Sequence, residues 1–315
     1  MGFSRSLEPA DDISIVQANR EQEALSWDGH RHRITTYSSP VEPIMSRFHL
    51  VSLLAVVGAA VGLPLSGDAM RWNLAALLVV AYATLFGLGV AFIRLQFFGP
   101  NICRGPAAWK LCALTFDDGP DASATEPLLA LLRRERVQAS FFCIGARVLE
   151  FPLLAAGIAA DGHLLANHTH RHRWWTNFLS PAALHEEILR AQDAIRSATG
   201  ITPRYFRPPV GLTNPGLPRV LRRLGLACVG WDVRSLDRVP ISADRVARRI
   251  RRGLRGGSIV LLHDGGVDPQ RLLVIVERVI AFARNEGYRF VRLDQLLGHD
   301  VAVTGNSRGA DARDA

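Results

Sequence analysis

The chain has 315 residues, of which 48% are hydrophobic and 21% charged, and this balance excludes a protein that is disordered over its whole length. Its 37 lysines and arginines (only Lys110 is a lysine) outnumber 29 acidic residues, giving a formal net charge of +8. This charge permits contact with nucleic acid, anionic lipid or an anionic polymer without choosing among them. Its 4 cysteines have no C-x-x-C spacing and are too few for a disulfide framework.

Residues 1–44 are polar and have no sustained hydrophobic period, so we expect a disordered tail there. Residues 45–97 contain two apolar stretches, 48–65 and 73–93. At about 1.5 Å per residue, such helices reach roughly 27 and 31 Å, close to the ~30 Å hydrocarbon core of a bilayer. We predict a two-helix transmembrane anchor, with a buried hairpin of a globular protein as the alternative. Small residues typical of close helix packing in lipid are Gly58, Gly62, Gly87 and Gly89.

Basic residues flank the two apolar stretches unevenly. The basic residues before the first stretch are Arg31, Arg33 and Arg47. Those after the second stretch are Arg94, Arg104 and Lys110, and the link between the two carries only Arg71. Taken by itself, this pattern favours both ends in the cytoplasm. A translation start at Met45 would instead make the first stretch resemble a signal sequence.

Between residues 105 and 298, short apolar runs alternate with helical patterns. Strands are predicted at 111–116, 139–143, 163–167, 227–231, 258–262 and 288–292, and helices at 127–136, 148–160, 182–197, 216–224, 243–254 and 270–286. This order predicts an α/β domain with a parallel sheet, followed at 299–315 by a polar tail that we expect to be disordered. An acidic Asp117-Asp118 pair, rather than a glycine-rich phosphate loop, follows the first strand. We therefore expect a (β/α) barrel, closed or slightly open, rather than a nucleotide-binding sheet.

Unusual polar residues follow the predicted strands. They are Asp117 and Asp118; His168, His170 and His172; Arg207; Trp231 and Asp232; and His263 and Asp264. Because the carboxyl ends of parallel strands meet at one rim of a barrel, we expect these side chains to lie close together, as in an active site.

The acidic pair and the histidines together indicate a metal site. His168 and His172 are four residues apart and face one way in a helix or a strand, whereas His170 joins them only in a strand. Two imidazoles and one carboxylate form a three-ligand set with open positions for water and substrate. The other carboxylate would then remain free as a general base. The alternatives are a plain Asp-Gly-Pro turn and histidines that pack or cap a loop.

Further residues suit the remaining steps of a hydrolysis. His263 could protonate a leaving group, and Arg207 could orient the free carboxylate. The N–H groups of the stiff loop that contains Pro209 and Val210 could face a developing oxyanion, and Trp231 could form a wall for a sugar face. The alternatives are a core histidine, a structural turn and a core tryptophan.

Five blocks, in this order, resemble the polysaccharide deacetylase family, metal-dependent amidases that share a domain with the chitooligosaccharide deacetylases of nodulation. The blocks are Thr115-Phe116-Asp117-Asp118-Gly119-Pro120, His168-Thr169-His170-Arg171-His172, Arg207-Pro208-Pro209-Val210-Gly211, Trp231-Asp232-Val233-Arg234-Ser235-Leu236-Asp237 and Leu261-Leu262-His263-Asp264. The resemblance runs over residues 111–297 and implies a catalytic domain at 105–298 with a distorted (β/α) barrel fold.

The resemblance also implies a role for each site residue. Asp117 would be the general base, Arg207 would orient it, and His263 would be the general acid. The metal ligands would be Asp118, His168 and His172, and the metal would be Zn²⁺ or another divalent transition ion such as Co²⁺.

Two positions depart from the family pattern. Val210 stands where tyrosine is common, which affects the shape of the substrate groove. The fourth block commonly reads Asp-Ser-x-Asp-Trp, and here it is Arg234-Ser235-Leu236-Asp237-Arg238. The carboxylate that would tune His263 could therefore be Asp237 or Asp232.

We expect a membrane-anchored, metal-dependent hydrolase that removes N-acetyl groups from a glycan (chitooligosaccharide, peptidoglycan or exopolysaccharide) and releases acetate. The alternatives are an O-acetyl esterase, a lipid-linked amino-sugar deacylase and a catalytically retired glycan-binding protein. Arginines at 245–255 could indicate nucleic-acid binding, but we expect them to spread around a helix as a solvated or lipid-facing surface, with no nucleic acid bound. Glycan substrates favour a multi-pass membrane protein with its catalytic domain outside the cytoplasm, against the charge pattern.

Overall fold

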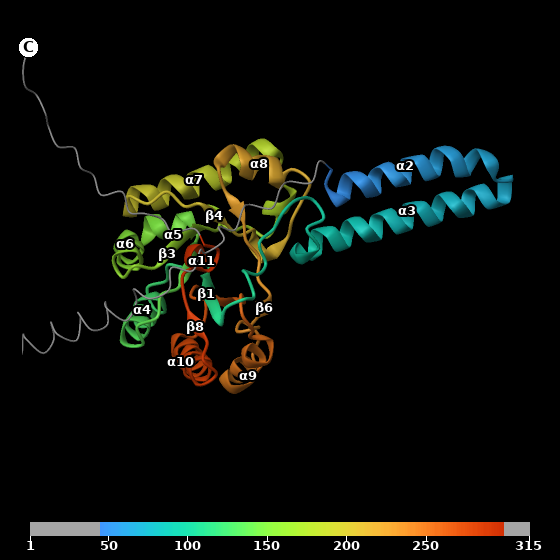
Figure 1. The fold of residues 1–315 in the computed structure, drawn as a ribbon. Coiled ribbons are helices and arrows are strands. Elements are labelled where there is room, and N and C mark those ends of the chain that lie inside the picture. The colour runs from blue at the N-terminus through green and yellow to red at the C-terminus, as the bar shows by residue number, and fades with distance from the viewer. Residues whose placement is uncertain (1–44, 299–315) are drawn as a thin grey trace, which may run out of the picture. The chain divides into compact units, whose positions relative to one another are not determined.

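The computed structural model describes residues 45–298. The two tails predicted at 1–44 and 299–315 lie outside the described residues. The described chain begins with helices α2 (Arg47–Leu65) and α3 (Asp68–Ala91), which run side by side as a hairpin (Figure 1). By length and composition both could cross a membrane, and almost none of their residues are buried.

Small and polar residues hold the hairpin together. A side chain at Gly62 would place its Cβ 3.1 Å from Leu74, so glycine allows the two helices to approach closely there. The hydroxyls of Ser52 and Tyr82 are 3.0 Å apart across the helices. The other predicted packing glycines differ. A Cβ added at Gly58 would lie 4.0 Å from Leu78, one at Gly87 would meet nothing within 4 Å, and one at Gly89 would collide with the Phe97 ring.

The rest of the described chain is built on one parallel sheet. Its strands are β1 (Leu111–Asp117), β2 (Ser140–Cys143), β3 (Leu164–Asn167), β4 (Tyr205–Phe206), β5 (Ala227–Cys228), β6 (Val233–Arg234), β7 (Ile259–His263) and β8 (Arg289–Phe290). The order is β5-β4-β3-β2-β1-β7-β6, and β8 also pairs with β1. A short segment joins the sheet at two places, since Ile102 pairs with Val229, just after β5, and Arg104 pairs with Ser258, just before β7. The prediction of a distorted α/β barrel is confirmed in the form of a curled, open half-barrel.

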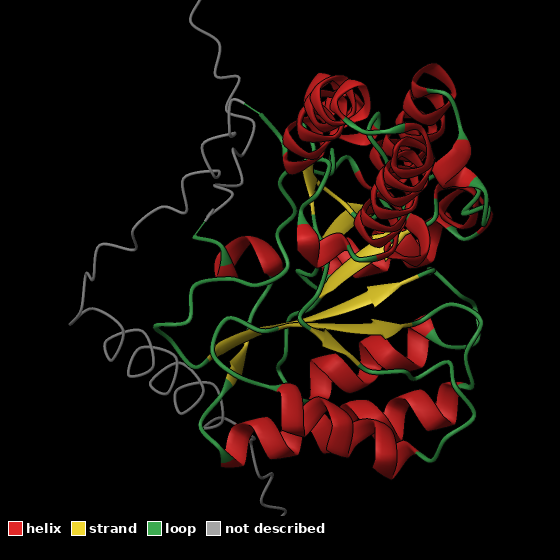
Figure 2. Cartoon of the chain, turned by 90° about the vertical axis from the view of Figure 1, so that its right-hand side faces the viewer, coloured by secondary structure: helices red, strands yellow, loops and turns green. Residues whose placement is uncertain are grey.

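Helices cover the sheet on two sides (Figure 2). They are α4 (Thr125–Arg134), α5 (Gly145–Glu150), α6 (Pro152–Ala160), α7 (Pro181–Thr199), α8 (Leu217–Leu224), α9 (Ala243–Gly253), α10 (Pro269–Asn285) and α11 (Leu293–Leu296), with short 3-10 turns η1 (Ile93–Leu95), η2 (Thr176–Phe178) and η3 (Pro209–Gly211). The central strand β1 is buried along almost its whole length. One large hydrophobic cluster joins it to α4, α9 and α10 and supports the rim at which the strands end.

Several elements differ from the sequence prediction. The helix predicted at 148–160 is divided into α5 and α6, because Pro152 starts a new helix where it needs no N–H partner. The strand predicted at 227–231 ends at Cys228, and the short elements β6 and α11 were not predicted.

Candidate active site

The acidic pair lies where β1 ends. Asp117 is the last residue of the strand, and Asp118 turns the chain with φ 74°. Both side chains are buried. Gly265 allows this turn to pack tightly, because a Cβ there would lie 2.2 Å from the Asp118 carbonyl oxygen. The segment is thus the turn that its Asp-Gly-Pro composition predicts, and it also presents two carboxylates at the rim of the sheet.

Asp118, His168 and His172 converge on one point. Oδ1 of Asp118 lies 3.4 Å from Nε2 of His168 and 3.3 Å from Nε2 of His172. One ligand atom from each of the three residues lies within 4.8 Å of the others. Asp118 Oδ1 is buried and has no hydrogen-bond partner among the described residues. A buried carboxylate oxygen facing two imidazole nitrogens fits a divalent transition ion, for which O and N donors are ordinary ligands.

A kinked loop, rather than a strand or a helix, brings the two histidines together. Thr169 and His172 both have positive φ, 68° and 49°. Asn167 Oδ1 accepts a hydrogen bond from Thr169 N, and Thr169 Oγ1 accepts one from His172 N. His168 Nδ1 donates to the carbonyl of Arg207 at 2.8 Å, which leaves Nε2 free to bind a metal. His170 lies apart, beside Gly145.

Burial and the neighbouring charges affect the pKa values of Asp118 and His172 differently. Burial raises the pKa of Asp118, but the adjacent imidazoles of His168 and His172 outweigh it and hold that pKa well below its usual range. Burial and the charge of His168 lower the pKa of His172 to about 4. His172 is therefore neutral near pH 7, as a metal ligand must be.

Asp117 is held by a buried arginine. Nη1 of Arg207, whose side chain is fully buried, donates to Asp117 Oδ1 at 2.6 Å and to Thr115 Oγ1 at 2.9 Å. Its Nη2 donates to the carbonyl of Gly230, and its guanidinium lies 3.9 Å from the centroid of the Phe142 ring. These contacts fix both the position of Arg207 and the direction of the Asp117 carboxylate.

His263 pairs with Asp237 and not with Asp232. Asp237 accepts hydrogen bonds from His263 Nδ1 at 2.9 Å and from His263 N at 2.8 Å. Burial lowers the pKa of His263, but the bond to Asp237 outweighs it and raises the pKa above its usual value. Asp232 instead accepts from Ile259 N and Ser258 Oγ at the opposite end of β7. The suggestion that Asp232 tunes the pKa of His263 is therefore wrong, because Asp232 accepts hydrogen bonds at the start of β7 and not at the end where His263 lies.

One pocket of about 200 Å³ joins these groups to the substrate-wall candidates. Val210 has φ 57° and is 59% exposed, and it lines the pocket together with Trp231. Gly211 packs under the tryptophan, since a Cβ there would lie 2.4 Å from the ring. Pro209 is buried and does not line the pocket.

Two residues near the site, Arg238 and Asp264, were named in the sequence analysis but were given no role there. Arg238 Nη1 donates to Asp118 Oδ2 at 2.7 Å, which leaves Oδ1 as the oxygen that faces the histidines. The sequence did mark this position as unusual, because Arg238 stands where the family pattern has tryptophan. Asp264 lies behind the acidic turn, and burial raises its pKa to about 7, although Thr125 donates to it.

Comparison with known proteins agrees with this architecture. Residues 104–229 match the family model described as polysaccharide deacetylase. A peptidoglycan-N-acetylglucosamine deacetylase of Bacillus cereus is 33% identical over 190 residues, which is 60% of this chain and 88% of that protein. A chitooligosaccharide deacetylase of a Bradyrhizobium species is 40% identical over 153 residues, 48% of this chain and 69% of that one.

A solved structure extends the likeness to the fold. The family 4 acetyl xylan esterase of Clostridium thermocellum, in complex with a cobalt ion, is 32% identical and has a TM-score of 0.56. The match covers 60% of this chain and 90% of that one. On its fold and its relatives, this chain belongs to the polysaccharide deacetylase family of hydrolases.

Proposed function

We propose that this chain is a metal-dependent deacetylase that removes N-acetyl groups from the amino sugars of a glycan and releases acetate. The observation that carries the proposal is the convergence, in one pocket, of a three-ligand cluster, a separate carboxylate and a paired histidine. The names of the peptidoglycan and chitooligosaccharide deacetylase relatives support an N-acetylated glycan as the substrate class.

The metal would be held by Asp118, His168 and His172. Zn²⁺ suits this donor set, and the cobalt ion of the esterase relative makes Co²⁺ a second candidate. When bound, the cation would act as a Lewis acid toward the attacking water and the acetamide carbonyl oxygen.

The chain's own residues would perform the proton transfers. Asp117, directed by Arg207, would accept a proton from the water whose oxygen attacks the acetamide carbon. His263, whose Nδ1 is held by Asp237, would donate a proton from Nε2 to the amine nitrogen as the C–N bond breaks. Acetate and the free amino sugar are then the products.

The loop and the tryptophan would position the substrate. The backbone N–H of Val210 would face the developing oxyanion, because proline has no N–H and the N–H of Gly211 already donates to the carbonyl of Pro208. Trp231 would form an apolar wall against one face of the sugar.

Acetate release tests the proposal directly. The full chain, purified in detergent, is expected to release acetate from chitotetraose. This acetate release is expected to stop after prolonged chelation and to recover when Zn²⁺ or Co²⁺ is added. Acetate release that persists after chelation would show that the reaction does not depend on a metal. Acetate from acetylated xylan alone would favour the O-acetyl esterase that the Clostridium relative suggests. No acetate from either substrate or from peptidoglycan fragments would indicate a retired, glycan-binding scaffold.

We further propose that residues 45–97 anchor the enzyme in a membrane and that residues 105–298 form the catalytic domain, outside the cytoplasm. The exposed apolar surface of α2 and α3 supports the anchor, because leaving it in water would be costly. The full chain is expected to remain in membranes after alkaline carbonate extraction, and a reporter fused after Ala315 is expected to be active outside the cytoplasm. Extraction into the soluble fraction would overturn the anchor. A cytoplasmic reporter would point to a lipid-linked amino-sugar substrate.

A further inference from the structure

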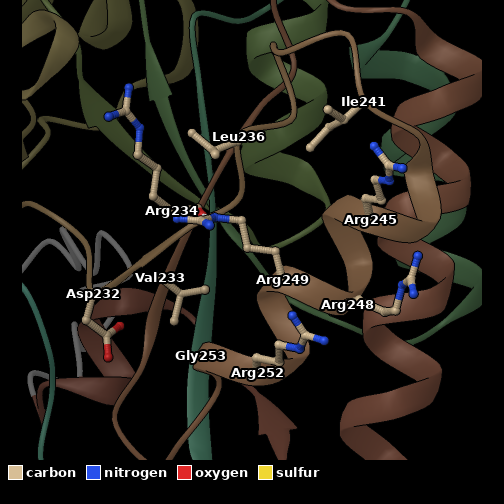
Figure 3. Close-up of a pocket in the computed structure, with 10 residues that line it drawn as sticks. All are labelled: Asp232, Val233, Arg234, Leu236, Ile241, Arg245, Arg248, Arg249, Arg252 and Gly253. Carbon is tan, nitrogen blue, oxygen red and sulfur yellow. The ribbon is translucent and has the colours of Figure 1, made fainter.

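A second groove, of about 630 Å³, lies beside the catalytic pocket, between β6 with the segment that follows it and helix α9. Five arginines line it, and we call it the arginine groove: Arg234, Arg245, Arg248, Arg249 and Arg252. Figure 3 shows four of the five arginines of α9 along one side and Arg234 across from them. Apolar side chains such as Val233 and Ile241 also line the groove.

The helix presents these arginines by their spacing. Positions 245, 248, 249 and 252 follow the i, i+3, i+4, i+7 pattern that places residues on one helix face. The opposite face carries Val246 and Ile250, which are buried in the core. The expectation that the arginines spread around the helix is therefore wrong for these four. The remaining two are engaged elsewhere, Arg251 against the Phe282 ring and Arg255 with Asp232.

The charges of the groove are not neutralised by acidic side chains. In the described part of the chain, none of its five arginines forms an ion pair. Arg248 and Arg249 donate only to backbone carbonyls, those of Asp244 and Arg234. Asp232 also lines the groove, but its buried side chain pairs with Arg104 and Arg255, and the neighbouring Asp244 pairs with Arg278. Like charges gathered in one concavity repel each other and attract an anion.

The groove adjoins the catalytic pocket. Arg234 and Leu236 line both, so one extended ligand could occupy the two together. Guanidinium groups bind carboxylate and phosphate oxygens through paired hydrogen bonds. We propose that the arginine groove binds oxyanion groups, carboxylate or phosphate, that the glycan carries next to the sugar being deacetylated. This inference rests on the proposed function, and the lining residues that the groove shares with the catalytic pocket favour a substrate over an anionic membrane surface.

Paired substrates that differ only in charge test the inference. The full chain in zwitterionic nanodiscs is given a tetrasaccharide of alternating N-acetylglucosamine and N-acetylmuramic acid, or its carboxyl methyl ester. A second pair is chitotetraose with and without one phosphate ester. The wild type is expected to have a KM roughly fivefold lower for the charged member of at least one pair, and that pair identifies the oxyanion. An Arg245→Gln/Arg252→Gln variant is expected to lose this difference.

A charge-matched control is Arg190→Gln/Arg196→Gln on helix α7, where both arginines form exposed ion pairs away from the groove. It is expected to keep the preference for the charged substrate. Equal KM values within both pairs for the wild type, or a preference that survives in the groove variant, would overturn the inference. If the preference for the charged substrate vanishes when anionic lipid is added to the nanodiscs, the arginine groove binds the membrane surface instead of the substrate. Absence of acetate even from neutral chitotetraose would contradict the proposed function, not the groove alone.

Discussion

Replacing Asp117 with asparagine is expected to lower kcat for acetate release by about 10²–10⁴-fold, the usual contribution of a general base. Asparagine keeps an oxygen that can accept the hydrogen bond from Arg207 at the Oδ1 position, but it cannot take a proton from water. The three residues proposed as metal ligands are unchanged in this variant. Stoichiometric binding of Co²⁺, followed by its visible absorption, should therefore persist while acetate release is lost.

Two controls separate chemistry from folding in this experiment. Asp193→Asn changes the same functional groups on the exposed face of α7 and should keep full activity. Because the fully buried Arg207 loses its countercharge in Asp117→Asn, the melting temperature should fall, and activity must be compared well below it. Full activity in Asp117→Asn would remove Asp117 as the base. Loss of Co²⁺ binding together with activity would instead make it part of the metal site.

The rim of the sheet could be predicted because it depends on alternation between strands and helices. β1 and β7 are apolar runs that end at Asp117 and His263, and parallel strands end at the same edge. The short strand β6 could not be predicted in this way. It has only two residues, Val233 and Arg234, and one of them is charged and exposed. Its place depends on pairing with β7 rather than on its own composition.

The grouping of the histidines was predicted for the wrong local reason. Spacing of four residues suggested a helix or a strand, whereas two residues with positive φ turn the loop so that His168 and His172 meet. Such a conformation depends on hydrogen bonds that the side chains of Asn167 and Thr169 accept from the backbone, which no periodic pattern encodes.

The contacts between side chains far apart in the sequence could not be predicted from the sequence either. Asp232 and Asp237 are five positions apart and both follow β5, so sequence alone left them equivalent as partners of His263. The turn at Ser235 decides between them, because its Oγ donates to Asp237 Oδ1 and holds that carboxylate toward the rim. Arg238, next in sequence, then reaches Asp118.

Replacing His263 with glutamine is expected to lower kcat by about 10²–10³-fold and to remove the basic limb of the pH profile. A general acid works only while protonated, so activity falls as the pH rises through its pKa. Burial lowers the pKa of His263, and the bond to Asp237 outweighs burial and raises it. In Asp237→Asn, with His263 intact, that pKa should fall, and the basic limb of kcat should move to lower pH. The measurement is kcat for acetate release between pH 5 and 9.

Asp232→Asn supplies the matched control, because it removes the same charge from the aspartate that does not contact His263. Its carboxylate holds Ile259 N and Ser258 Oγ, so this variant should lose thermal stability while its basic limb stays in place. If the limb stays fixed in Asp237→Asn, His263 is not the titrating acid, whatever the fall in kcat. If it moves equally in Asp232→Asn, the shift reflects the net charge of the domain rather than the contact between Asp237 and His263. If the basic limb of kcat moves only in Asp237→Asn, proton donation by His263 depends on its contact with Asp237.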